Sequence, residues 1–143
     1  MEKQEQPTAP AKPIPVVNTW AQPFWDAARE ERLIIQKCGA CGSHVFYPRI
    51  ACPHCSADNL EWVEASGKGT VYSYTVVESN APSSFLQDMP YVVAVIRLEE
   101  GVQMLSNVIG CEPHDVECDM PVEVAFEELN DEFTLPKFRP TAA

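Results

Sequence analysis

The sequence lacks the features that most quickly assign a function to a protein. It contains no run of about 18 or more apolar residues, so we expect no membrane-spanning helix. Residues 1–15 are polar and proline-rich and lack the apolar core of a signal peptide, which favours a cytoplasmic location. GxSxG, glycine-rich phosphate-binding and HExxH motifs are also absent. We therefore expect no catalytic residues on this chain.

Basic side chains are scarce, and their distribution is uneven. The chain has 10 Lys/Arg against 21 Asp/Glu, a formal net charge of −11. Residues 1–68 hold seven Lys/Arg and eight Asp/Glu, whereas residues 69–143 hold three and thirteen. Nucleic acids and anionic membranes attract basic surfaces, so neither is an expected partner. A nucleic-acid-binding barrel is kept only as a remote alternative.

The length and composition predict a small protein of the α+β class that is mostly β. With 143 residues, 45% of them apolar, the chain has room for one ordinary domain or two very small ones. Its 13 prolines favour short elements separated by turns. We divide the chain into a disordered or extended lead-in (1–17), a helix plus metal ribbon (18–65) and a barrel with a C-terminal tail (66–143).

A short helix is expected before the first cysteine. Asn18 or Thr19 can cap this helix, and Pro23 falls in its first turn. Apolar residues then recur at roughly helical spacing, at Phe24, Trp25, Ala28 and Leu33. Residues 33–37 are predicted to form a strand that leads into the first cysteine pair.

Five runs rich in β-branched and aromatic residues follow Gly67. These predicted strands span residues 70–77, 91–98, 102–109, 122–126 and 133–138. The turn between the second and third runs, at 99–101, is short enough for a hairpin. Five short strands in sequence fit a small closed barrel of the OB type.

Four of the six cysteines form two CxxC pairs separated by ten residues. These four are Cys38, Cys41, Cys52 and Cys55. In a reducing compartment such pairs are metal ligands more often than disulfides, and two of them can surround one tetrahedral ion. Four thiolates leave no open coordination position, so the ion is expected to be structural. Zinc is favoured, with iron as the alternative because iron also accepts four thiolates.

The remaining polar groups near the cysteines are given ordinary roles. Gly39 and Gly42 are expected to adopt the positive φ of a tight metal-binding turn. Two histidines beside the site, His44 and His54, are superfluous to a four-cysteine site and are expected at the surface or behind the ligands.

A second group of potential ligands lies in the loop after residue 110. Cys111, Cys118 and His114 could form another metal site or a nucleophile with its base. Two ordinary thiols fit this loop better, because its acidic residues raise a thiol pKa and so disfavour the reactive thiolate.

Three short segments together carry a resemblance to a known family. They are Phe24-Trp25 before the ribbon, Tyr47-Pro48-Arg49 between the cysteine pairs, and Gly67-x-Gly69 before the barrel. With the rubredoxin-like ribbon they resemble the zinc-ribbon plus OB-fold proteins associated with acyl-CoA metabolism, formerly a domain of unknown function. The resemblance covers residues 20–140, nearly the whole folded chain.

The resemblance implies a function that composition does not. Members of this family are small non-catalytic partners of thiolase-superfamily enzymes, which make or cleave carbon–carbon bonds in acyl-CoA thioesters. The nucleophilic cysteine belongs to the large subunit. We therefore expect an accessory subunit in a two-plus-two heterotetramer, with aromatic and steroid-derived acyl-CoA thioesters among the candidate substrates. The sequence identifies neither the acyl group nor the direction of the reaction.

The resemblance also implies site residues. It matches the four ribbon cysteines to the zinc ligands. Residues placed where the family contacts its partner or CoA are Phe24, Trp25, Phe46, Tyr47 and Arg49. The candidate cations nearest the ribbon are Lys37, Arg49 and Lys68. The first two aromatics fit a helical core as well as an interface, and Arg49 also fits a surface salt bridge. A free-standing acyl-CoA carrier and a rubredoxin-like electron carrier are the alternatives.

Overall fold

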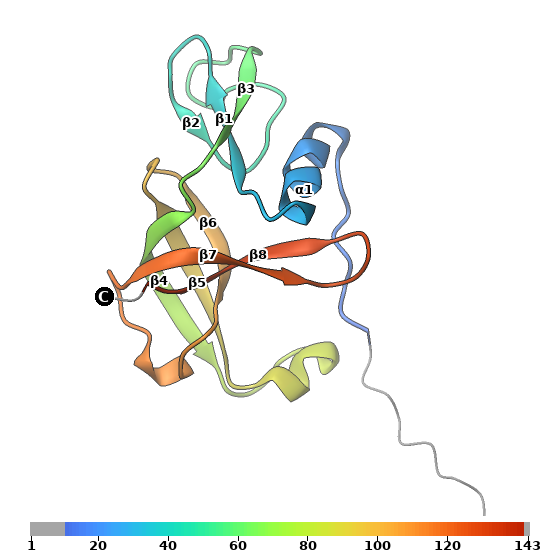
Figure 1. Cartoon of the computed structure of the whole chain (residues 1–143), viewed down its shortest axis with the longest axis vertical. Helices are drawn as coiled ribbons and strands as arrows, with labels where there is room; N and C mark the ends of the chain where they lie inside the picture. The colour runs from blue at the N-terminus through green and yellow to red at the C-terminus, as the bar shows by residue number, and fades with distance from the viewer. Residues whose placement is uncertain (1–10, 142–143) are drawn as a thin grey trace, which may run out of the picture.

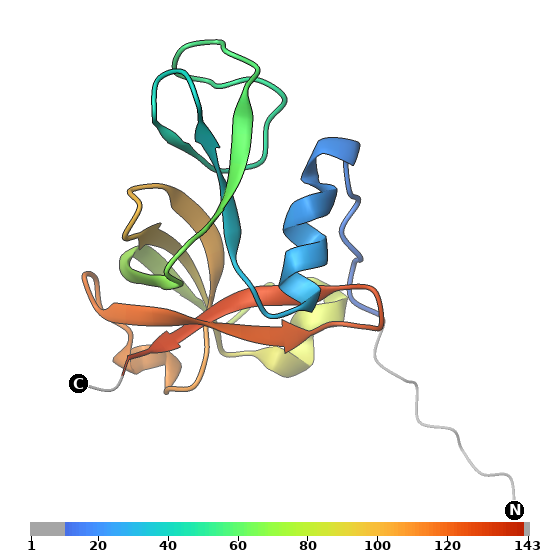
Figure 2. The same ribbon diagram turned by 45° about the horizontal axis from the view of Figure 1, so that its top comes forward.

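The computed structural model describes residues 11–141, which form one short helix, a three-stranded ribbon and a barrel (Figure 1). Residues 11–18 run beside the helix without regular secondary structure (Figure 2). Lys12 fixes this segment by an ion pair with Asp88, 2.6 Å long. The expected lead-in over residues 1–17 is therefore tested only in part, since residues 1–10 lie outside the described ones.

The helix α1 (Gln22–Arg29) follows a single 3-10 turn, η1 (Thr19–Ala21). Pro23 lies in the first turn of α1 as expected. Asn18 is the N-cap residue of η1, but its side chain makes no capping hydrogen bond, and the residue before α1 itself is Ala21, so the predicted cap on α1 by Asn18 or Thr19 is wrong. In the described residues, no helix has the length and hydropathy needed to cross a membrane.

The helix is also shorter than its apolar spacing predicts. Glu31 adopts a positive φ of 58° and turns the chain immediately after α1. Leu33 is therefore buried at the start of a strand rather than on the helix.

The ribbon sheet has the order β2-β1-β3, with all pairs antiparallel. Its central strand β1 (Ile34–Cys38) runs into the first cysteine, as predicted. β2 (His44–Val45) and β3 (Leu60–Glu64) flank it. The sequence analysis missed β3, because its five residues directly follow the second cysteine turn and are only partly buried.

The second half of the chain forms the predicted five-stranded barrel, closed in the order β4-β5-β6-β8-β7. Its strands are β4 (Lys68–Val77), β5 (Tyr91–Leu98), β6 (Gln103–Val108), β7 (Pro121–Glu128) and β8 (Thr134–Pro140). The predicted hairpin between β5 and β6 is confirmed, with Gly101 at a φ of 93° in its turn. Two 3-10 turns, η2 (Ser83–Asp88) and η3 (Pro113–Asp115), lie in the connections.

The barrel closes through a short parallel contact between β6 and β8. Only Val108 and Phe138 are in register there. Pro136, two residues earlier on β8, has no N–H to donate, and its carbonyl accepts a hydrogen bond from the Ser106 hydroxyl at 2.8 Å. The parallel pairing of β6 with β8 is therefore short, and the Ser106 side chain supplies a further contact between the two strands.

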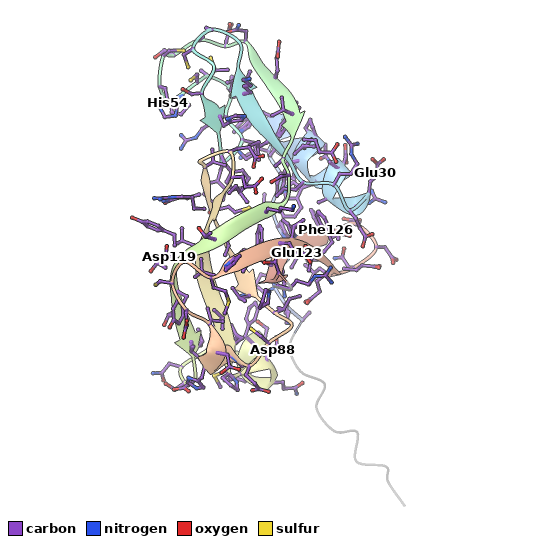
Figure 3. The ribbon with its side chains drawn as sticks, turned by 60° about the vertical axis from the view of Figure 1, so that its left-hand side comes forward. Glu30, His54, Asp88, Asp119, Glu123 and Phe126 are labelled. Carbon is purple, nitrogen blue, oxygen red and sulfur yellow. The ribbon has the colours of Figure 1, made fainter. Side chains whose placement is uncertain are left out.

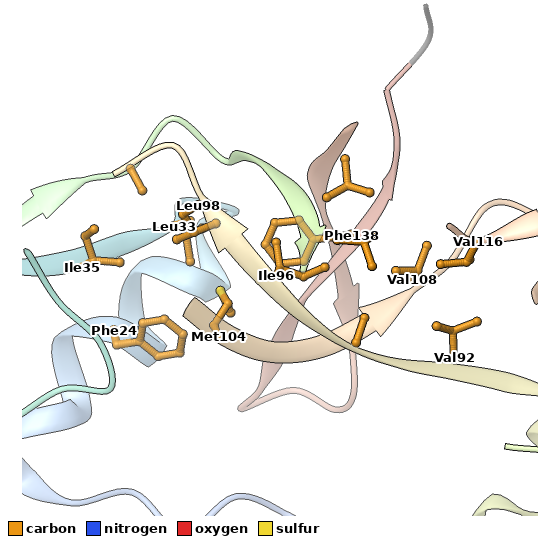
Figure 4. Packing of buried hydrophobic residues seen from close by; sticks show 14 residues of the cluster. Phe24, Leu33, Ile35, Val92, Ile96, Leu98, Met104, Val108, Val116 and Phe138 are labelled. Carbon is orange, nitrogen blue, oxygen red and sulfur yellow. The ribbon is translucent and has the colours of Figure 1, made fainter. Parts of the chain in front are cut away.

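One hydrophobic core joins the helix, the base of the ribbon and the barrel. Phe24 of α1 and Leu33 and Ile35 beside the ribbon belong to the same buried cluster as Ile96 and Phe138 of the barrel (Figure 4). The outer ribbon has a separate core of only three buried residues, Cys38, Val45 and Cys52. The division of the chain at residues 65 and 66 stays a prediction.

Substitution of Gly69 tests the tight pairing at the start of the barrel. A Cβ at Gly69 would overlap the carbonyl oxygen of Arg97 on β5. We expect Gly69→Ala to lower the free energy of unfolding by about 1–3 kcal/mol, because the two strands must shift apart. Ser73→Ala, at an exposed position of the same strand, serves as the control in urea denaturation. Equal stability of the two variants would contradict this account.

Candidate functional site

The four ribbon cysteines form one cluster. Their sulfur atoms all lie within 4.8 Å of one another. The separation is 3.6 Å between Cys38 and Cys55 and 3.7 Å between Cys41 and Cys52. Four sulfurs bound to one zinc ion at about 2.3 Å would be separated by about 3.8 Å, whereas a disulfide needs about 2.05 Å. The cluster therefore fits a tetrahedral metal ion and excludes the disulfide alternative.

Two similar backbone turns position the sulfurs. In the first turn, the backbone carbonyl of Cys38 accepts a hydrogen bond from Gly42 N at 2.9 Å, and the backbone N–H of Cys38 donates one to Ser43 O at 2.9 Å. In the second turn, the backbone carbonyl of Cys52 accepts a hydrogen bond from Ser56 N at 2.9 Å, and the backbone N–H of Cys52 donates one to Ala57 O at 2.7 Å. Gly42 and Ser56 occupy equivalent places and both have positive φ, 74° and 67°.

The prediction for Gly39 is wrong in its physical reason. Gly39 does not have a positive φ. A side chain is disfavoured there instead because a Cβ would lie 2.7 Å from the Asn59 side-chain nitrogen and 3.2 Å from the Asn59 carbonyl oxygen.

The thiols influence each other's protonation. The hydroxyl and the backbone N–H of Ser43 lower the pKa of the Cys41 thiol to about 6. At Cys55 the Ala57 N–H lowers the pKa, but the adjoining Cys38 thiol and loss of water outweigh it and raise the pKa to about 12. Crowding of negative sulfurs opposes ionisation of the last thiol, and a divalent cation at the centre would remove that opposition.

The side chain of Gln36 holds the loop between the two cysteine pairs by hydrogen bonds to its backbone. This residue is buried on β1, and its amide donates to Arg49 O at 2.9 Å and accepts from Arg49 N at 2.7 Å. Further along the loop, the Tyr47 hydroxyl accepts a hydrogen bond from Leu105 N of β6 at 3.1 Å. The sequence analysis missed Gln36, because a single glutamine in a strand carries no recognisable signal.

An apolar pocket of about 360 Å³ lies against the neighbouring strands β6 and β8. Its walls come from four parts of the chain: residues 18–25, the loop between the cysteine pairs, β6 and β8. Members from the four parts are Trp20, Phe24, Trp25, Phe46, Tyr47, Met104, Leu105, Leu135, Pro136 and Lys137. Lys137, whose side chain is only 15% exposed, ion-pairs with Glu127 at 2.7 Å beside it.

The pocket gathers the four predicted aromatics but not the predicted cations. Phe24 is only 6% exposed and stacks edge-on with Trp25 at 5.2 Å, so it forms the floor of the pocket and part of the core. Lys37 and Arg49 are exposed on the ribbon. Lys68 lies beside Arg97 in a different pocket of about 430 Å³. The assignment of these residues to a CoA or partner site stays a prediction.

The second group of cysteines shows no metal geometry. Among residues 11–141, Cys111, Cys118 and His114 form no cluster of ligand atoms, and His114 instead contacts Glu78 at 2.6 Å. Burial raises the pKa of the Cys111 thiol, and the charges of Asp115 and Glu112 raise it further. A raised thiol pKa makes Cys111 a poor nucleophile.

A rubredoxin-like ribbon followed by a closed OB-type barrel defines the class of this protein, and sequence comparison defines the family. Residues 25–61 match the family model described as the ChsH2 rubredoxin-like zinc ribbon domain. Residues 62–127 match the model described as the ChsH2 C-terminal OB-fold domain. The chain belongs to this ChsH2-type, or DUF35, family.

Three relatives illustrate the similarity. A DUF35 domain-containing scaffold protein of Methanothermobacter thermautotrophicus is 40% identical over 118 residues, 81% of this chain and 84% of that protein. A probable enoyl-CoA hydratase alpha subunit of Thermomonospora curvata is 40% identical over 97% of this chain, which spans only 43% of that protein. A solved chain titled Ltp2-ChsH2(DUF35) aldolase has a TM-score of 0.81 at 40% identity, covering 89% of this chain and 98% of that one.

Loss of one buried ligand tests the metal site. We expect Cys52→Ser to reduce the bound metal from one ion per chain to near zero, because three thiolates no longer complete the site. Cys118→Ser, at an exposed thiol outside the cluster, is the matched control. Elemental analysis by mass spectrometry reports both. Retention of the ion in Cys52→Ser, or its loss in Cys118→Ser, would contradict the assignment.

Removal of the Gln36 amide tests its role under the loop. Gln36→Leu keeps the side-chain size but leaves Arg49 N and O without their partner, so we expect a loss of about 1–3 kcal/mol in the free energy of unfolding. Gln103→Leu changes an exposed glutamine of β6 and should stay within about 0.5 kcal/mol of the wild type. Chemical denaturation measures both, and equal losses would show that Gln36 has no special role.

Proposed function

We propose that this chain is a non-catalytic accessory subunit of a complex that processes acyl-CoA thioesters. The observation that supports this most directly is the near-complete match to a chain whose title joins two components, Ltp2 and ChsH2(DUF35), in an aldolase. The scaffold name of the archaeal relative agrees with a supporting role. The catalytic residues then belong to a large partner of the thiolase superfamily, and carbon–carbon bond cleavage or formation is the reaction class.

The proposed ion is zinc, with a structural role. All four coordination positions are filled by cysteine, so the ion has no place for a substrate. Cys41 and Cys55 are exposed and the outer ribbon has three buried residues, so the ion supplies stability that the ribbon core cannot. Iron is the alternative, and the visible absorption of the purified protein distinguishes the two metals.

The apolar pocket is the proposed contact with the partner and the acyl-CoA thioester. Its volume is within the range of small-molecule sites, and its walls are mainly apolar with a few polar groups. Tyr47 and Leu105, 51% and 58% exposed, lie at its rim and are available to a second protein. The separated positions of Lys37, Arg49 and Lys68 favour contacts with different parts of the partner over one phosphate site.

A hydratase complex is a second candidate. It is supported by the name of the Thermomonospora relative, of which this chain matches less than half. In this second candidate the catalytic residues for hydration would lie outside the region that this chain matches. The identity of the large subunit separates the two candidates, and a free-standing acyl-CoA carrier requires that there be no large subunit. The cytoplasmic location and the two-plus-two stoichiometry stay predictions.

Recovery of the native complex tests this proposal. The chain, tagged in its own host, is expected to co-purify with a thiolase-superfamily subunit at a one-to-one ratio, with a native mass that fits two copies of each. Trp20→Ala removes a 41% exposed aromatic from the pocket and should reduce recovery of the large subunit, since exposed aromatics anchor interfaces.

The matched control is Leu86→Ala, at an exposed apolar residue of η2 outside that pocket. This variant should recover the large subunit as the wild type does. Elution of the wild type as a lone metal-bearing monomer at low salt would contradict the proposal. Recovery of a hydratase subunit instead would select the second candidate.

A further inference from the structure

Acidic residues are absent from three adjacent strands of the barrel. Residues 69–143 contain thirteen Asp/Glu, yet β4, β5 and β6 contain none. All thirteen lie on β7 or in the connections; Asp88, Asp119 and Glu123 are examples (Figure 3). The outer surface of β4, β5 and β6, here called the neutral face, therefore carries no negative charge, and the acidic residues of this half lie on β7 and in the connections.

An apolar row crosses the neutral face. Ala94 and Ile96 of β5 point into the core, so Val95 between them points outward. The strand register places Val95 opposite Leu105 of β6 and Ser73 of β4. Tyr72, 51% exposed, lies next to Ser73 at the bulge of β4. The row thus runs from Tyr72 through Val95 to Leu105 and reaches the rim of the apolar pocket.

The cation Arg97 lies beside this row. The Arg97 guanidinium lies 4.5 Å from the centroid of the Tyr72 ring. Among residues 11–141 Arg97 forms no salt bridge, whereas the other two cations of the barrel half, Lys137 and Arg139, pair with Glu127 and Glu123. Stacking fixes the guanidinium plane and leaves its N–H groups free, which suits bidentate binding of a carboxylate.

We propose that the neutral face docks the large subunit through an apolar patch of that subunit, with a carboxylate of the partner bound to Arg97. This inference rests on the proposed function, because it names the same partner. Charge complementarity supports it, since the charged residues of β4, β5 and β6 are the two cations Lys68 and Arg97, and Arg97 forms no salt bridge among residues 11–141. Continuity also supports it, because Leu105 belongs both to the row and to the pocket.

Two other occupants fit the face less well. A second copy of the chain, docked by the same face across a two-fold axis, would offer Arg97 no acidic residue. A nucleic acid strand would meet only the two cations Lys68 and Arg97 on these three strands, whereas such grooves need a basic track.

Charge reversal at Arg97 tests the docking. The purified large subunit is titrated with the full chain by calorimetry. Arg97→Glu is expected to weaken binding about tenfold or more, because two carboxylates then face each other across the interface. Tyr72→Ser should weaken binding as well, because it removes the stacking surface and one end of the apolar row. Arg139→Glu reverses an exposed charge on β8, outside the face, and should bind as the wild type does.

Thermal unfolding of each variant checks that the fold is kept. If the large subunit binds wild type and Arg97→Glu equally, the neutral face is not the interface, although the proposed function stands. If no large subunit binds the wild type, both proposals are wrong. A change in self-association of Arg97→Glu, seen by light scattering with partner binding unchanged, would assign the face to a second copy and overturn the inference.

Discussion

The sulfur cluster of the ribbon is the constraint on which the rest of the proposed site depends. The outer ribbon has too small a core to hold its own shape, with three buried residues of which two are themselves cysteines. Closing both cysteine pairs around one ion also closes the ten-residue loop between them. That loop places Phe46 and Tyr47 in the wall of the pocket, where the Tyr47 hydroxyl accepts a hydrogen bond from Leu105 N of β6. An ion bound by the four cysteines would therefore be structural in the ribbon and, through this loop, would shape a surface on the barrel.

The barrel contributes a complementary constraint. The pairing of β8 with β6 is short, and apolar side chains of both strands line the pocket beside the loop. Acidic residues lie on β7 and in the connections of the barrel, and they disfavour contacts with nucleic acids and anionic membranes. An apolar pocket in the surface of such an acidic protein suits specific association with another protein. This division of surfaces fits a supporting subunit better than an independent enzyme.

Much of this arrangement could be predicted from sequence, for identifiable reasons. The spacing of Cys38, Cys41, Cys52 and Cys55 is the one that a tetrahedral metal site requires. The barrel strands can be predicted because each is a run rich in β-branched residues between two turns. Features that depend on tertiary contacts could not be predicted. Gln36 becomes important only because Arg49 folds over it, and α1 stops at a turn that its apolar spacing does not reveal. The scattering of Lys37, Arg49 and Lys68 likewise follows from the fold alone.

The most direct test of the account is turnover of an acyl-CoA thioester by the reconstituted complex. The large subunit would be assayed alone, with the wild-type chain and with Cys52→Ser, beside the wild-type chain alone. We expect no turnover by the chain alone, full activity when both subunits are present, and reduced activity with the metal-site variant. Turnover by the purified chain alone would contradict the central claim that catalysis resides on its partner.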